Sequence, residues 1–149
     1  MQNYNSMLKN SIRNCSDLNE ICEVVRLNIQ NAKKDVGDLR IVYVAGKVTA
    51  DGETKILFNL KRLSLYTKQL RRKFRFVFSS ADVFDQETYW KLNLAKPLHE
   101  ESFYKFWRKI LRSGVTDIYM TPEWEMSTGA TDEYNTAKKI GLNIHFFKK

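Results

Sequence analysis

The sequence predicts a three-layer α/β protein in which helices flank a parallel sheet of about four to five strands. Short, continuous apolar runs such as "IVYVAG" and "FRFVFSS" are typical of strands buried on both faces. Segments with the 3.6-residue apolar spacing of amphipathic helices separate these runs. An alternation of strand and helix favours parallel pairing with right-handed crossovers, which places helices on both faces of the sheet.

The first 38 residues predict helices that precede this alternation. One apolar face of "SDLNEICEVVRLNIQNAKKDVG" carries Leu18, Ile21, Cys22, Val25, Ile29 and Ala32. Ser16 or Asp17 would cap the start of this helix, and Gly37 would end it. We therefore expect an N-terminal helical arm, residues 1–38, followed by one α/β domain, residues 39–149.

The first half of the expected domain holds two strands and one helix. The first strand ends at Gly46, and a polar turn, "KVTADGET", leads to a helix from about Thr54 to Lys73. The second strand covers 74–80. The following segment, residues 81–100, is expected to be irregular or partly helical, with Phe84, Tyr89 and Trp90 rather exposed.

The second half repeats the pattern. "ESFYKFWRKILRSG" predicts an amphipathic helix, and "TDIYMT" predicts the third strand. A loop then leads to a helix that starts near Ser127 and stops at Gly141, and "LNIHFF" predicts the final strand. The apolar face of that last helix is expected to contain Ala130, Tyr134, Ala137 and Ile140.

Composition narrows the function classes. The 149 residues carry a formal net charge of +8, which favours anionic partners but is also compatible with solubility alone. No apolar run is long enough to cross a bilayer, and the first residues lack the apolar core of a signal peptide, so we expect a cytosolic protein that does not enter membranes. Two cysteines and two histidines, without a Cys-x-x-Cys pattern, predict a reduced protein without a metal or other cofactor.

The start of the last helix is a candidate phosphate site. Ser127, Thr128 and Gly129 stand where backbone N–H groups and the helix dipole favour an anion. On these residues alone, an ordinary Ser/Thr N-cap is the better interpretation. The turn after the first strand matches neither the Gly-Lys-Ser/Thr phosphate loop nor Gly-x-Gly-x-x-Gly.

Glu133 is the sharper candidate, because it falls inside the apolar face of the last helix. The positive end of the helix dipole is expected to favour its ionised form, which could act as a nucleophile or a base. The alternative is a partly buried glutamate bonded to Tyr43, Trp124 or a backbone group. Position alone does not separate the two.

The stretches "IVYVAGK" and "TDIYMTPEWEMSTGATDEYNTAKKIGLNIHFF" resemble the nucleoside 2-deoxyribosyltransferase superfamily. The likeness is to its small bacterial and phage branch and to the nucleoside 5'-monophosphate N-glycosidases, and it covers residues 40–149. It implies a Rossmann- or flavodoxin-like fold. It also implies cleavage or transfer at an N-glycosidic bond through a glycosyl-enzyme, and a homodimer or larger homo-oligomer.

The resemblance also implies residue roles. Glu133 matches the nucleophile that attacks C1' of the sugar, and Tyr43 matches the tyrosine that orients it. Ser127 matches a phosphate-contacting serine of the monophosphate glycosidases, which points to a nucleoside 5'-monophosphate as substrate. The expected substrate-binding residues are Gly46, Lys47, Lys109, Trp124, Ser127, Thr128 and Gly129.

One position departs from the family pattern. Lys109 stands where the family has an aspartate that holds the sugar hydroxyls, and a lysine cannot accept a proton from them. Asp82, Asp85 or Glu101 would have to take this role for hydrolysis to persist. Without a substitute, a nucleotide-binding module without catalysis is the expected alternative.

Three further features have open interpretations. The basic segment 68–75 is more simply a solvated helix C-terminus than a nucleic-acid contact, and DNA binding ranks last among the functions. Tyr89 and Trp90 could form a lid that stacks on the base, or a core anchor. His99 and His145 are expected to be structural.

Overall fold

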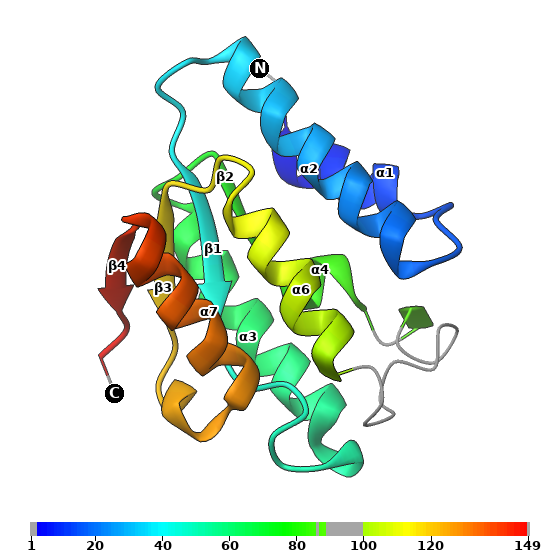
Figure 1. The fold of residues 1–149 in the computed structure, drawn as a ribbon, viewed down its shortest axis with the longest axis vertical. Helices are drawn as coiled ribbons and strands as arrows, with labels where there is room; N and C mark the ends of the chain where they lie inside the picture. The colour runs from blue at the N-terminus through cyan, green and yellow to red at the C-terminus, as the bar shows by residue number, and fades with distance from the viewer. Residues whose placement is uncertain (1–2, 86, 89–99, 149) are drawn as a thin grey trace.

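The computed structural model describes residues 3–85, 87–88 and 100–148, and its centre is a four-stranded parallel sheet (Figure 1). The strands are β1 (Ile41–Ala45), β2 (Phe76–Ser79), β3 (Asp117–Met120) and β4 (Asn143–Phe146), in the order β2-β1-β3-β4. All three pairings are parallel. The predicted three-layer α/β class is therefore confirmed.

Helices cover both faces of the sheet. In Figure 1, α6 (Glu100–Leu111) and α7 (Thr128–Ile140) lie in front of the strands, and α3 (Ile56–Arg71) lies behind them. The short elements are η1 (Glu53–Lys55), α4 (Ser80–Val83) and η3 (Trp124–Met126). The ring of Tyr43 in β1 lies 4.7 Å from that of Trp107 in α6, so this side of β1 faces the α6–α7 layer.

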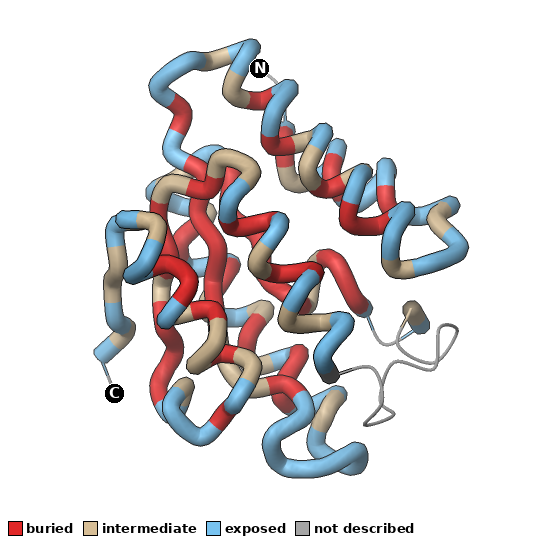
Figure 2. Tube along the Cα trace, viewed as in Figure 1, coloured by how far each residue is buried: buried red, intermediate tan, exposed pale blue. Residues whose placement is uncertain are grey.

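The core forms along the central strand. All five residues of β1 are buried, as expected for a strand with helices on both sides (Figure 2). Phe78 and Trp107 extend the aromatic core on the α6 side, with ring centroids 6.5 Å apart. By contrast, the edge strand β4 is only partly covered.

The N-terminal segment forms α1 (Tyr4–Ile12) and α2 (Leu18–Asp35). Asp17 caps α2 by accepting a hydrogen bond of 2.8 Å from the N–H of Glu20, as predicted. The predicted end at Gly37 is wrong, because the helix stops at Asp35 and Val36 turns the chain into extended backbone. The apolar face of α2 is buried as expected, with Ile21, Cys22, Val25, Ile29 and Ala32 inside and Leu18 half-buried.

Two predicted elements differ from the structure around residue 80. The second strand stops at Ser79, because the Ser79 side chain and Asp82 form a capping box that starts α4. Phe84 is fully buried instead of exposed, and its ring lies 5.3 Å from Phe103 and 5.1 Å from Phe106. The predictions for Tyr89, Trp90 and His99 lie outside the described residues. Among the residues that are described, no helix is both long and apolar enough to cross a membrane.

Candidate active site

The structure joins Glu133 to Tyr43, two residues separated by 90 positions in the chain. Tyr43 projects from β1 toward the α6–α7 layer, and Glu133 projects inward from α7. The Tyr43 hydroxyl donates a hydrogen bond of 3.0 Å to Oε2 of Glu133. The Ser80 hydroxyl, just after β2, lies 3.3 Å from the same tyrosine oxygen. The strand, the helix and the β2–α4 junction thus meet at one buried polar cluster.

The protonation state of Glu133 differs from the sequence-based expectation. The side chain is only 6% exposed, and burial raises its pKa to about 8, although the hydrogen bond from Tyr43 lowers it; the neighbouring charge of Asp132 adds to the increase. Burial therefore favours the neutral carboxyl group, in contrast to the expected preference for the ionised form. A pKa of about 8 leaves this carboxyl group mainly protonated at pH 7.

The start of α7 is organised as an N-cap. Ser127 is buried, and its hydroxyl accepts a hydrogen bond of 3.1 Å from the N–H of Ala130. The hydroxyl of Thr128, which is exposed, accepts a hydrogen bond of 2.8 Å from Tyr104 of α6. Ser127 thus acts as the N-cap of α7, as the simpler interpretation predicted. The remaining N–H groups of the first turn have no partner within the helix and point away from its start.

The two glycines of the predicted site differ in their surroundings. A Cβ on Gly46 would lie 2.2 Å from Oγ1 of Thr121, so the close approach of this residue, which follows β3, requires glycine there. A Cβ on Gly129 would meet nothing nearer than 3.8 Å within the described residues, and no positive φ is recorded for this residue. Packing explains Gly46. It does not explain Gly129.

Lys47 and Trp124 are held by other partners. The Lys47 ammonium lies 3.1 Å from carboxylate oxygens of both Asp51 and Glu123, so its charge is already balanced. Trp124 in η3 stacks on Tyr134 with centroids 4.7 Å apart. Both residues border the turns at the carboxyl end of the sheet, but the contacts described for them are with residues other than Glu133.

The structure places Lys109 apart from the candidate site. It is exposed on α6. Burial raises the pKa of the Cys22 thiol in α2, and the charge of Lys109 partly opposes this increase. The neighbouring residue Arg108 contacts α7 instead, and the Arg108 guanidinium donates hydrogen bonds of 3.0 and 2.6 Å to the Asp132 carboxylate. One residue along a helix turns the side chain by about 100°, and this explains why adjacent positions face different neighbours.

The three acids considered as substitutes for the missing aspartate have separate environments. Asp82 forms an ion pair of 2.8 Å with Arg71 and caps the backbone at Ser79. Asp85 is exposed and accepts a bond of 2.8 Å from the N–H of Thr88, and Glu101 is exposed. Asp82 is thus engaged in holding the β2–α4 junction together.

Sequence reasoning missed four participants: Ser80, Tyr104, Arg108 and Asp132. Ser80 carried a usable signal, because it is the last residue of a predicted strand and so lies at the carboxyl edge, where parallel sheets bind ligands. The helix–helix contacts of Arg108 and Tyr104 depend on how α6 is rotated against α7, which no local pattern reports.

A buried carboxyl group bonded to a tyrosine can supply a proton, accept one, or attack carbon once it is ionised. The described residues contain no group of three or more His, Cys, Asp or Glu side chains placed to hold a metal ion. The Tyr43–Glu133 pair offers acid–base or nucleophilic chemistry.

Comparison with known proteins gives one match. The family model described as "Domain of unknown function (DUF4406)" matches residues 40–146, which begin just before β1 and extend to the end of β4. No curated protein and no solved structure matches the chain.

Proposed function

We propose that this chain, which belongs to the DUF4406 family, binds a nucleoside 5'-monophosphate and cleaves or transfers at its N-glycosidic bond, with Glu133 as the nucleophile. The observation that carries the proposal is the buried hydrogen bond between Tyr43 and Glu133. A carboxyl group so withdrawn from water is costly to keep, and such groups concentrate at functional sites. The likeness of "IVYVAGK" and the last thirty residues to nucleoside 2-deoxyribosyltransferases supplies the reaction class.

The proposed reaction has two displacements. An oxygen of the ionised Glu133 carboxylate attacks C1' of the sugar, and the C1'–N bond breaks with its electron pair leaving on the base, which takes up a proton. Water, or a second base, then attacks C1' and restores the carboxylate. The hydrogen bond from Tyr43 orients the attacking group and stabilises its charge.

The phosphate is proposed to lie at the start of α7. Free N–H groups and the positive helix end favour a dianion there. Gly129 supports this placement, because neither packing nor φ requires glycine among the described residues, so the missing side chain leaves room for a ligand. By the same likeness, we propose that the protein acts as a homo-oligomer.

A nucleotide-binding module without catalysis is the second candidate. It is favoured by the pKa of about 8 for Glu133, which leaves most of the carboxyl groups protonated at pH 7. It is also favoured by the position of Lys109, exposed on α6 where the related enzymes carry an aspartate.

One experiment separates the two candidates. The purified protein is incubated with a panel of deoxynucleoside monophosphates, and released base is measured by chromatography between pH 6 and pH 9, a window set around the pKa of about 8. If the protein is an enzyme, the rate of base release should increase about tenfold for each unit by which the pH is raised toward that pKa, because the ionised fraction of Glu133 increases in the same way. No base should be released by Glu133→Gln. Saturable binding without released base at any pH would instead establish the module.

A further inference from the structure

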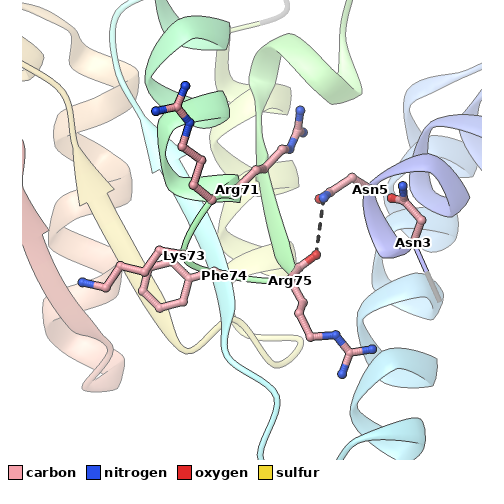
Figure 3. Close-up of a pocket in the computed structure, with 7 residues that line it drawn as sticks. Asn3, Asn5, Arg71, Lys73, Phe74 and Arg75 are labelled. Carbon is pink, nitrogen blue, oxygen red and sulfur yellow. Dashed lines mark hydrogen bonds between the residues drawn. The ribbon is translucent and has the colours of Figure 1, made fainter. Parts of the chain in front are cut away.

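A pocket lies at the other end of the strands from Glu133. It is an open hollow of about 370 Å³ between the start of α1 and the connection from α3 to β2 (Figure 3). Its walls are Asn3, Asn5 and residues 71–75. Since β2 begins at Phe76, the pocket sits at the amino edge of the sheet, and the candidate active site lies toward the carboxyl edge.

The pocket has an excess of positive charge. Arg71 is balanced by Asp82, but Arg72, Lys73 and Arg75 form no ion pair with any carboxylate in the described part of the chain. Outside the pocket, Arg26, Arg40 and Arg108 are paired with acids, whereas Arg13, Arg62 and Arg112 have no ion pair among the described residues. Three exposed cations therefore remain close together without neutralisation.

Aromatic rings hold two of these cations in place. The Lys73 ammonium lies 5.5 Å from the centre of the Phe74 ring, and the Arg75 guanidinium lies 5.2 Å from that of Tyr4. A cation–π contact restricts the position of a charge without cancelling it. The two side chains are thus partly ordered while remaining able to attract an anion.

Helix capping does not account for the whole group. At the end of α3 the main chain already satisfies the Leu70 carbonyl, which accepts hydrogen bonds of 2.9 Å from the N–H groups of both Lys73 and Phe74. Arg75 lies beyond the helix, next to β2, where it gains little from the helix dipole.

The wall opposite the cations is fixed by Asn5. Its amide nitrogen donates to the carbonyl of Arg75 at 3.3 Å, and its amide oxygen accepts from the N–H of Val77 at 3.1 Å. α1 is thereby tied to the outer edge of β2. These hydrogen bonds fix the position of one wall of the pocket relative to the other.

We propose that this pocket binds the phosphate backbone of a single-stranded nucleic acid. Lys73 and Arg75 extend in different directions from the Phe74 segment (Figure 3), so they cannot close on one phosphate but can contact successive phosphates of a strand. A concave site suits an unpaired nucleotide better than the convex surface of a duplex. The net charge of +8 adds attraction at long range.

The test is fluorescence anisotropy with a labelled single-stranded oligothymidylate of about 20 nucleotides at several salt concentrations. The pocket variant is Arg72→Gln/Lys73→Gln/Arg75→Gln. The matched control, Lys105→Gln/Lys138→Gln/Lys139→Gln, removes the same charge from exposed positions on α6 and α7. We expect the pocket variant to bind about tenfold more weakly, with a salt slope smaller by about 2, and the control to change less than about threefold.

Each alternative outcome would overturn the proposal. Equal losses in the two variants would indicate that net charge alone attracts the strand. Inorganic phosphate or thymidine monophosphate that competes as well as the oligonucleotide would indicate a single-anion pocket. No binding at about 50 mM salt would also refute it. Thermal unfolding verifies that each variant folds, and single Arg72→Gln, at an exposed position, provides a milder substitute.

Discussion

At the scale of single residues, the Glu133 carboxyl group is the feature that most needs a cause. It sits among buried neighbours with a pKa of about 8, so the folded chain favours its neutral form. A glutamine would keep the size and the hydrogen bond without any cost of ionisation. A chain selected only for stability would therefore gain from losing the acid. The presence of an acid at this cost in stability supports a role for its proton or its charge.

Replacing Tyr43 with phenylalanine tests how this carboxyl group is tuned. The hydrogen bond from Tyr43 lowers the pKa of Glu133, so Tyr43→Phe should raise that pKa further above 8 while the ring packing against Trp107 is kept. A ¹³C NMR titration of the glutamate side chains measures the shift, and Glu133→Gln identifies the resonance. An unchanged or lower pKa would contradict the geometry.

The two glycines of the site should respond in opposite ways to alanine. Gly46→Ala would force a Cβ to within 2.2 Å of Thr121 Oγ1 and should lower the free energy of unfolding by about 2 kcal/mol. Gly129→Ala has room and lies in a helix, so it should leave stability equal or raise it by about 0.5 kcal/mol. Urea unfolding measures both changes.

A ligand experiment completes this comparison. If Gly129 leaves room for the phosphate of a bound nucleotide, Gly129→Ala should weaken nucleotide binding in calorimetry while the protein stays folded. Undiminished binding in a stable Gly129→Ala protein would remove the start of α7 from the proposed site.

At the scale of elements, the outer edge of β2 depends on α1. An exposed strand edge invites pairing with other chains, and here Asn5 occupies it by bonding to both Arg75 and Val77. Asn5→Ala should therefore lower the free energy of unfolding by about 1–2 kcal/mol, since two backbone groups lose their partner. Asn10→Ala, at an exposed position of the same helix, is the matched control and should change stability by less than about 0.5 kcal/mol. Equal effects in urea unfolding would contradict this role.

The elements also show how far sequence reasoning extends. Apolar runs and helical spacing predicted all four strands and the helices α2, α3, α6 and α7, because burial imposes those periods. The burial of Phe84 was missed, since a lone aromatic after a strand carries no period. The Tyr43–Glu133 contact was accessible through a family resemblance, whereas the choice between Arg108 and Lys109 as the residue facing α7 required the rotation of α6.

At the scale of the whole molecule, a carboxyl group at each end of the sheet favours the opposite protonation state. Asp117, at the start of β3, is fully buried and receives a bond of 2.8 Å from Nε of Arg40. It also lies 2.8 Å from Nε2 of His145. Burial raises its pKa, but the hydrogen bonds from Arg40, Thr116 and His145 together lower it to about 2. The folded state thus prefers a charged Asp117 and a neutral Glu133.

These two groups predict how stability changes with pH. The folded pKa of Asp117 lies below its reference value of 3.8. Its contribution to the free energy of unfolding is therefore present above pH 3.8 and decreases by about 2 kcal/mol as the pH falls toward 2. The folded pKa of Glu133 lies above its reference value of 4.5. Its contribution to the free energy of unfolding is therefore complete below pH 4.5 and decreases by on the order of 4 kcal/mol as the pH rises toward 8.

Urea unfolding across this pH range, with one variant for each group, tests the prediction. Glu133→Gln should match the parent protein near pH 4 and become progressively more stable than it toward pH 8, because the amide cannot ionise. Asp117→Asn should be less stable at neutral pH but should lose less stability on acidification, because the charge that acid removes is already absent. The readout is the slope of the difference from the parent protein, which cancels the contributions of groups that both share. A Glu133→Gln protein that follows the parent curve up to pH 8 would mean that this carboxyl group ionises freely, and a buried site tuned for proton-dependent chemistry would then have no physical basis.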